Sequence, residues 1–168
     1  QQSLETLRKI AALVKSTPEE VLAAVERQAQ AVKQLEKELE GQRRKTAVSM
    51  VDTLFESARK VKDVNVLASV VSGVDRDGMR QLVDSLRQKL GSGVVILGAA
   101  DDGKVALITG VTKDLTSRVQ AGKIVQELAR KVGGSGGGRP DIAEAGGKDT
   151  SALESTISDA YSLLERML

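Results

Sequence analysis

The residues with the clearest chemical potential lie in one glycine-rich stretch at 133–149, which reads GGSGGGRPDIAEAGGKD. Glycine lets a partner approach the backbone closely, and successive glycine N–H groups can form a concave site for an anion. The run GGSGGG by itself is equally typical of a flexible linker, but the RPD triplet and the second glycine pair are not linker composition. The stretch therefore predicts a binding loop, whose candidate residues are Gly136, Gly137, Gly138, Arg139 and Lys148.

Arg139 and Lys148 each have a structural alternative to ligand binding. A guanidinium can hold a phosphate with two parallel hydrogen bonds, but Arg139 can equally form a salt bridge to Asp141 that shapes the loop. Both roles are open, and they are compatible. Lys148 stands at the expected start of the last helix, where the dipole favours anions, although the acids Asp149 and Glu154 already occupy that positive end.

Further basic residues precede the loop. Lys113, Arg118 and Lys123 lie on or just before the helix expected to lead into it, and Arg118 and Lys123 fall outside its apolar stripe and should be exposed. The net charge is +2 overall, +3 over residues 61–132 and −3 over residues 133–168. We therefore expect an anion-binding surface mainly on the middle segment, near the start of the glycine-rich loop.

Catalytic arrangements are missing from the sequence. The chain has no histidine and no cysteine, which excludes serine–histidine and cysteine–histidine nucleophile systems, thiolate metal sites and disulfides. The close acid pairs, Asp75 with Asp77 and Asp101 with Asp102, stand beside glycines and indicate turns. With only one phenylalanine and one tyrosine, the chain lacks the aromatic platforms on which many RNA modules stack bases. Binding is the function that remains.

The elements that must position these residues begin with a helical stem. A short helix is expected at 3–15 and a long one at about 18–60, which starts at the capping signal Thr17-Pro18. The long helix has a narrow apolar stripe, typical of packing against one partner helix, formed by Leu22, Val25, Ala29, Val32, Leu35 and Leu39. We expect the short helix to fold back on the long helix as an antiparallel hairpin. The apolar stripe extends beyond the short helix, and its uncovered part should be free for weak self-association.

The pattern changes to α/β after residue 60. Strands are expected at 64–74, 94–100 and 105–111, and helices at 79–90, 115–132 and from Ser151, which forms a second capping box with Glu154. The first two strands should be parallel and the third antiparallel. The fold class is therefore α+β or α/β: a helical hairpin stem at 1–60, then a small mixed β-sheet domain at 61–168, covered by helices and carrying the glycine-rich loop.

The tract GGGRPDIAEAGG, preceded by a strand and a basic helix, resembles the C-terminal domain of bacterial alanyl-tRNA synthetases, called C-Ala. The globular part of that domain is shared with DHH-type phosphoesterases. Two departures stand out: Ser135 interrupts the glycine run, and Arg139 stands where the phosphoesterases carry a histidine. The second departure is expected for the synthetase branch.

The resemblance implies a non-catalytic tRNA-binding domain that holds the tRNA elbow, so that aminoacylation and editing act on the same tRNA. It also implies that the stem can mediate formation of a homodimer, and that tRNA and the other domains of the parent synthetase are partners. No cofactor is expected in this chain, because ATP and zinc would belong to other domains. Two alternatives stay open: a nucleotide-binding module of a DHH-type phosphoesterase, and a pure oligomerisation domain.

The expected cellular location follows from features that the sequence lacks. The chain begins with Gln1 rather than methionine, so we expect a piece of a longer protein. No apolar run approaches the ~18 residues that span a membrane, and no signal peptide is present. We expect a cytoplasmic protein without a membrane partner.

Overall fold

The computed structural model describes all 168 residues, and they divide into two compact units at 1–46 and 47–168. The division lies earlier than the predicted boundary at residue 60, because the last turns of the long helix pack within the second unit. Leu54 is buried there, and Met50, Val51 and Phe55 are partly buried beside it.

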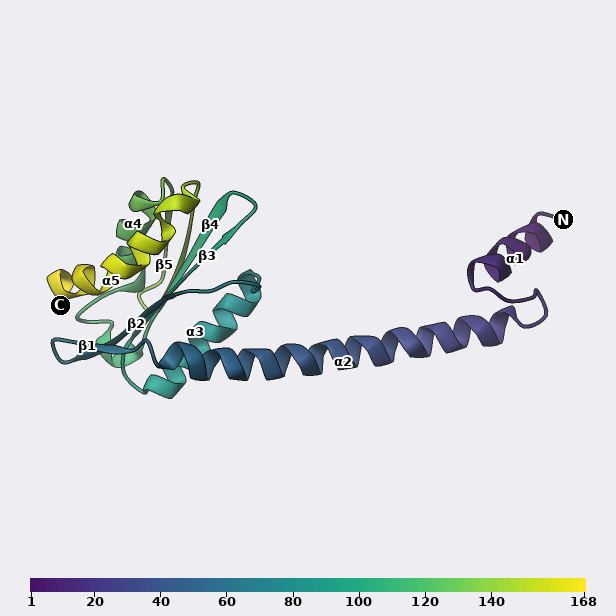
Figure 1. Ribbon diagram of the computed structural model, residues 1–168, viewed down its shortest axis with the longest axis horizontal. Helices are drawn as coiled ribbons and strands as arrows, with labels where there is room; N and C mark the ends of the chain where they lie inside the picture. The colour runs from purple at the N-terminus through teal and green to yellow at the C-terminus, as the bar shows by residue number, and fades with distance from the viewer. The chain divides into compact units, whose positions relative to one another are not determined.

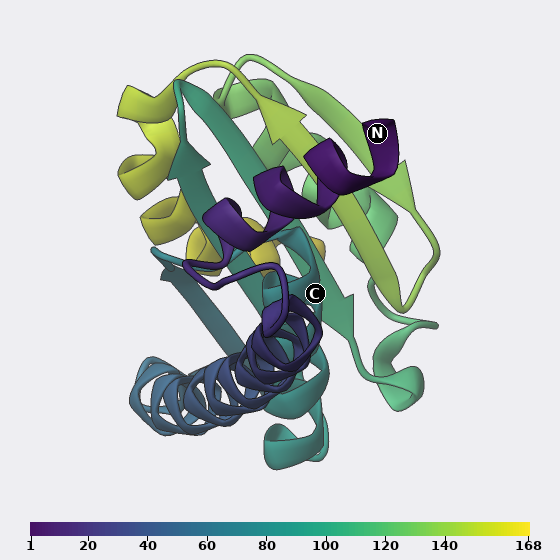
Figure 2. The same cartoon turned by 90° about the vertical axis from the view of Figure 1, so that its right-hand side faces the viewer.

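The first unit consists of helix α1 (Gln2–Leu13) and most of helix α2 (Val21–Phe55). The buried apolar side chains in this unit are Ala11, Val21 and Ala24, so α1 contacts only the first turns of α2. The predicted antiparallel hairpin is therefore wrong, and Figures 1 and 2 show α1 crossing the start of α2 instead of lying along it. Leu35 and Leu39 of α2 are more than half exposed. The capping box expected at Thr17 is absent, since α2 begins at Val21.

The second unit is built on a mixed sheet with the strand order β1-β2-β3-β4-β6-β5. Its strands are β1 (Arg59–Val61), β2 (Val64–Val70), β3 (Val94–Asp101), β4 (Lys104–Val111), β5 (Ser135–Gly138) and β6 (Ile142–Gly147). The pairing of β2 with β3 is parallel and that of β3 with β4 is antiparallel, as predicted. The expected fold class, a long helix followed by a small mixed sheet covered by helices, is confirmed.

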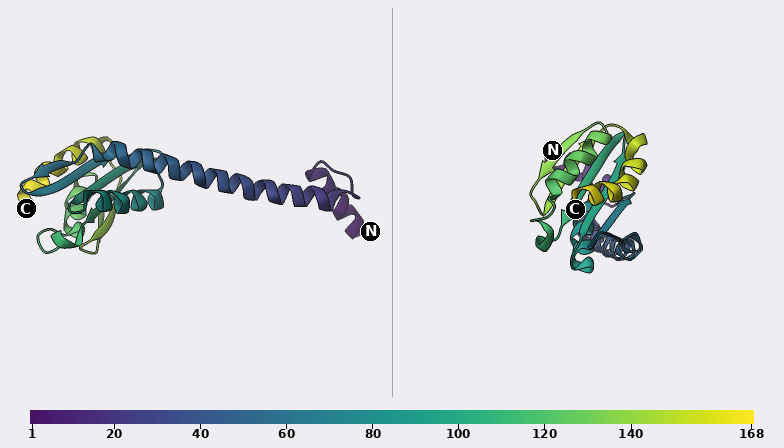
Figure 3. Two further views of the ribbon diagram at one scale, coloured as in Figure 1. Left: turned by 90° about the horizontal axis from the view of Figure 1, so that it is seen from below. Right: turned by 90° about the vertical axis from the view of Figure 1, so that its left-hand side faces the viewer.

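Helices cover both faces of this sheet. Helix α3 (Arg76–Leu90) and the end of α2 pack on one face. Helices α4 (Ala121–Lys131) and α5 (Leu153–Met167) pack on the other and stand in front of the strands in the right-hand view of Figure 3. The alternation of strand residues produces the two layers: Leu107 of β4 belongs to the α4–α5 side and Ile108 to the α3 side. The short 3-10 turns η1 (Lys113–Leu115) and η2 (Thr150–Ala152) precede α4 and α5.

The prediction of a loop at 133–149 was wrong in its secondary structure, because most of the stretch forms the β5–β6 hairpin. Strand β6 pairs with β4 along Ile142–Gly147, and β5 adds to β6 as the edge strand (Figure 2). Glycine has a low propensity for β-strands, so the sequence pattern did not predict this pairing. The capping box expected at Ser151 is also absent: Asp149 accepts a hydrogen bond from the Ser151 backbone N–H at 3.1 Å instead.

No helix in the chain combines the length and the apolar character needed to cross a membrane.

Candidate functional site

The glycines of the hairpin have different structural roles. A Cβ at Gly136 would lie 2.3 Å from the Cβ of Ala145, and one at Gly138 would lie 2.7 Å from the Cα of Ala143. Gly138 also has φ +158°. A Cβ at Gly137 would meet only the side-chain nitrogen of Gln126, at 3.4 Å. Gly136 and Gly138 are therefore required by strand packing, whereas Gly137, which is half-buried, has room for a Cβ on the edge strand.

The tight turn between β5 and β6 holds Arg139. Its backbone N–H donates to the carbonyl of Ile142 at 2.9 Å, and its Nε lies 3.3 Å from Oδ1 of Asp141. The structural alternative foreseen for Arg139, the salt bridge to Asp141, is thus present. The Arg139 side chain is nevertheless 74% exposed, so it stays available to a ligand.

Three of the predicted basic residues emerge at the same end of the sheet. The N–H of Ala121 donates to the carbonyl of Pro140 at 2.8 Å, which sets the first turn of α4, with Lys123, against the turn that holds Arg139. The N–H of Val111 donates to the carbonyl of Asp141 at 2.8 Å, which brings Lys113, just after β4, to the same turn. Lys113, Lys123 and Arg139 are all exposed, and we call these three residues the basic edge.

Arg118 is exposed, as expected, but it is engaged. Its two terminal nitrogens donate to the two carboxylate oxygens of Asp63, each at 2.9 Å. The hydrogen bonds from Arg118 lower the pKa of the Asp63 carboxyl. Because both terminal nitrogens of Arg118 are engaged by Asp63, Arg118 contributes less free positive charge than its position in the sequence suggests.

Lys148 lies apart from the basic edge. Its backbone N–H donates to the carbonyl of Val132, at the end of α4 opposite to Lys123. Between Arg139 and Lys148 runs the whole of β6, about 20 Å at the usual rise of a strand. The structure therefore does not bring Lys148 together with the other candidates.

Sequence reasoning missed a cluster formed by Arg76, Arg80 and Glu144. The Arg76 Nη2 lies 2.6 Å from Oε2 of Glu144, and the Arg80 Nη2 lies 3.2 Å from Oε1. Burial alone would raise the pKa of the Glu144 carboxyl, but the hydrogen bonds and charges of the two arginines outweigh it and lower the pKa. The two arginines lie one helical turn apart, which is visible in the sequence, but nothing local links them to a glutamate more than sixty residues away.

No three acidic side chains come close enough together to hold a metal ion. The features that can bind a ligand are therefore the basic edge, the open backbone at Gly137 and the missed arginine cluster.

Comparison with known proteins identifies the family of this chain. Residues 63–166 match the DHHA1 domain. The chain is 43% identical over 168 residues to an alanine–tRNA ligase of Solibacter usitatus, and 45% identical over 165 residues to one of Pelotomaculum thermopropionicum. These alignments cover 100% and 98% of the chain but 19% of each relative, so the chain spans about a fifth of their length.

A solved structure is similar over the same region. The C-Ala domain from Aquifex aeolicus alanyl-tRNA synthetase superimposes with a TM-score of 0.59 at 30% sequence identity. The match covers 66% of this chain and 96% of that domain.

Proposed function

Because this chain belongs to the DHHA1 family and is a C-Ala domain of the alanyl-tRNA synthetase type, we propose that it is the non-catalytic tRNA-binding part of an alanine–tRNA ligase. The single observation that supports this most directly is the basic edge. Lys113, Lys123 and Arg139 come from three separate elements and gather beside a glycine strand whose backbone a ligand can reach at Gly137.

This arrangement suits the sugar–phosphate backbone of a folded RNA. Lysine and arginine neutralise phosphates, and a bare backbone strand permits close approach. With aromatic residues almost absent, the surface is suited to reading the shape of the RNA rather than its base sequence. The tRNA elbow is a shape common to most tRNAs, so the domain would hold the elbow while aminoacylation and editing proceed at centres elsewhere in the parent enzyme.

The chain would work alongside the other domains of a cytoplasmic synthetase, where ATP and any zinc would bind. Its own residues offer no acid–base pair of the kind that acyl transfer needs. The isolated chain should therefore neither charge nor deacylate tRNA, nor hydrolyse nucleotides. Turnover that follows the purified protein through gel filtration would contradict this.

The tRNA-binding function can be tested by fluorescence anisotropy with whole tRNA over a range of salt concentrations. The double variant Lys113→Ala/Lys123→Ala should bind more weakly, and the salt slope should fall by roughly 0.7–0.9 for each phosphate that is no longer neutralised. Lys104→Ala is the matched control, because this exposed lysine stands at the opposite end of β4 from Lys113. tRNAs with different acceptor stems should bind alike. The proposed function fails if the parent chain does not bind tRNA at low salt, or if binding follows the acceptor-stem sequence.

Self-association is a second candidate function, favoured by the apolar side chains left uncovered on α2. Val32, Leu35 and Leu39 are all more than half exposed and recur at helical spacing. Exposed apolar stripes tend to mark interaction surfaces, so a homodimer through this helix is compatible with tRNA binding.

A further inference from the structure

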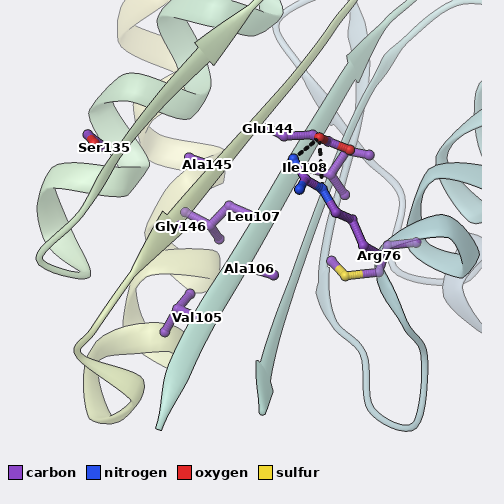
Figure 4. Close-up of a pocket in the computed structure, with 10 residues that line it drawn as sticks. Arg76, Val105, Ala106, Leu107, Ile108, Ser135, Glu144, Ala145 and Gly146 are labelled. Atoms are coloured by element: carbon purple, nitrogen blue, oxygen red, sulfur yellow. Dashed lines mark hydrogen bonds and ion pairs between the residues drawn. The ribbon is translucent and has the colours of Figure 1, made fainter. Parts of the chain in front are cut away.

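Two members of the cluster that the sequence did not reveal, Arg76 and Glu144, line a cavity of about 370 Å³. Figure 4 shows Arg76 reaching from α3 across β4 to Glu144 on β6. The apolar lining includes Met79, Ala106 and Ile108, and the polar lining consists of Arg76, Glu144 and the hydroxyl-bearing Ser135. Glu144 is the only acidic residue that lines this cavity.

The ion pairing in the cluster is uneven. Two guanidinium groups share the Glu144 carboxylate, and the neighbouring Asp77 carboxylate offsets part of the remaining positive charge of Arg76. The Glu144 side chain is only 16% exposed, whereas those of Arg76 and Arg80 are 78% and 55% exposed. Glu144 thus anchors the arginines from the sheet side, while much of their surface faces solvent.

The cluster adjoins the glycine hairpin. In the sheet register, Glu144 lies between Ile108 on β4 and Gly137 on β5. Because Gly137 has no side chain, no β5 side chain covers Glu144 on the edge side. Gly137 is thus next to Glu144 in the sheet, whereas a side chain at Gly137 would point toward Gln126 of α4, on the face opposite to α3.

A third arginine of α3 connects this surface to the basic edge. Arg87 donates from Nη1 to the carbonyl of Asp141 at 2.8 Å, in the same turn as Arg139. From Arg76 to Arg87 the helix advances about 16 Å. Arginines of α3 thus extend from the cavity to the turn at the basic edge, where Arg87 is largely covered and also pairs with Asp84.

We propose that Arg76 and Arg80 form a clamp for a backbone phosphate of tRNA, and that Glu144 occupies this clamp until the phosphate displaces it. This inference rests on the tRNA-binding function proposed above and extends the RNA-binding surface to the α3 side of the sheet. A phosphate, like a carboxylate, accepts paired hydrogen bonds from guanidinium groups. RNA suits the site better than an acidic protein segment does, because α3 leads from the clamp to the turn that holds Arg139 of the basic edge.

Substitutions of the two arginines and of Glu144 should change tRNA affinity in opposite directions. Arg76→Ala/Arg80→Ala should weaken tRNA binding about tenfold or more at low salt, because the charge-assisted hydrogen bonds to the phosphate are lost. The salt slope should fall by roughly 0.7–0.9, because one phosphate is no longer neutralised. Glu144→Gln should instead tighten binding severalfold, since the competing negative charge is gone. The conservative Arg76→Lys/Arg80→Lys should recover part of the loss, because it keeps the charge but not the paired geometry.

The experiment is fluorescence anisotropy with the full chain and whole tRNA, together with thermal melts that confirm the folding of each variant. The matched control is the exposed pair of Arg130 and Glu127 on α4, whose Nη1 and Oε1 atoms lie 3.1 Å apart. Arg130→Ala should weaken binding less than the clamp variant does, and Glu127→Gln should not tighten binding as Glu144→Gln does.

The outcomes separate this inference from the function on which it rests. If the clamp variant binds like the parent while Lys113→Ala/Lys123→Ala binds more weakly, the clamp is refuted and tRNA binding stands. If Glu144→Gln folds normally and binds no tighter, Glu144 does not compete with phosphate and the inference fails. If polyglutamate binds as tightly as tRNA and depends equally on Arg76 and Arg80, the occupant is an acidic protein segment and the inference fails. Absence of tRNA binding by the parent chain would refute the function itself.

Discussion

Substituting alanine at two adjacent glycines of β5 should separate packing from binding. Gly136→Ala and Gly137→Ala add the same methyl group to the same edge strand. At Gly136 the new Cβ would overlap the partner strand, 2.3 Å from the Cβ and 2.4 Å from the Cα of Ala145. At Gly137 it would make one ordinary contact, 3.4 Å from the side-chain nitrogen of Gln126, which is exposed and able to move.

These distances set the expected changes in stability. Relieving the overlap at Gly136 requires β5 to shift on β6, and overpacking of this kind costs about 1–3 kcal/mol. At roughly 2–4 °C per kcal/mol for a chain of 168 residues, the melting temperature should fall by about 2–12 °C. Gly137→Ala should change the free energy of unfolding by no more than about 0.5 kcal/mol, as for an ordinary surface substitution.

Binding should respond in the opposite order. The methyl group of Gly137→Ala would hold RNA away from the backbone of β5. The loss of about one hydrogen bond's net contribution, about 0.5–1.5 kcal/mol, corresponds to roughly a 2- to 12-fold weaker affinity. Gly137→Val should bind more weakly still, because its side chain is larger.

Thermal melts followed by circular dichroism, and anisotropy with whole tRNA, measure the two effects on the same samples. The reasoning is refuted if Gly136→Ala melts with the parent, since the strand contact would then be looser than the structure has it. It is refuted equally if Gly137→Val binds tRNA as the parent does, since the open backbone would then not contact RNA.

Three further predictions concern the partly buried hydroxyl of Tyr161, the exposed apolar stripe on α2 and stability in acid. Tyr161→Phe should lower the free energy of unfolding, measured in urea, by about 1–3 kcal/mol. The Tyr161 hydroxyl donates to the Ser57 carbonyl at 2.7 Å and accepts from the backbone N–H of Ala68 in β2. An unchanged urea midpoint of unfolding would contradict this. Leu35→Lys/Leu39→Lys should abolish weak self-association in sedimentation velocity, and identical sedimentation of parent and variant across concentrations would show that the stripe is not an interface. The Glu144 carboxyl has a folded-state pKa below its ordinary 4.5. Its contribution to the stability of the fold is therefore complete above pH 4.5 and disappears as the pH falls through the lowered pKa. The stability difference between the parent and Glu144→Gln, at most about 1 kcal/mol because both arginines are exposed, should therefore shrink in acid, and a difference that grows in acid would refute the ion pairing.

Local sequence patterns determined most of the second unit. The 3.6-residue period of Met79, Leu82, Val83 and Leu86 places one apolar face on α3, and all four side chains are buried. The β-branched runs before and after this helix predicted the parallel pair β2–β3. These predictions succeeded because helix and strand periodicity is carried by neighbouring residues. The motif GGGRPD likewise identified the family without any knowledge of the fold.

The tertiary structure alone decided how the charged and glycine residues are used. The pairing of Gly136 with Ala145 turned an expected loop into an edge strand, because β6 supplies backbone partners that glycine propensity does not reveal. Arg118 meets Asp63 at a separation of 55 residues, and Arg76 meets Glu144 at a separation of 68. Such pairs depend on strand order and register, which no local pattern encodes. For that reason the sequence could name the basic residues, while only the fold shows which of them face outward together and which already hold a carboxylate.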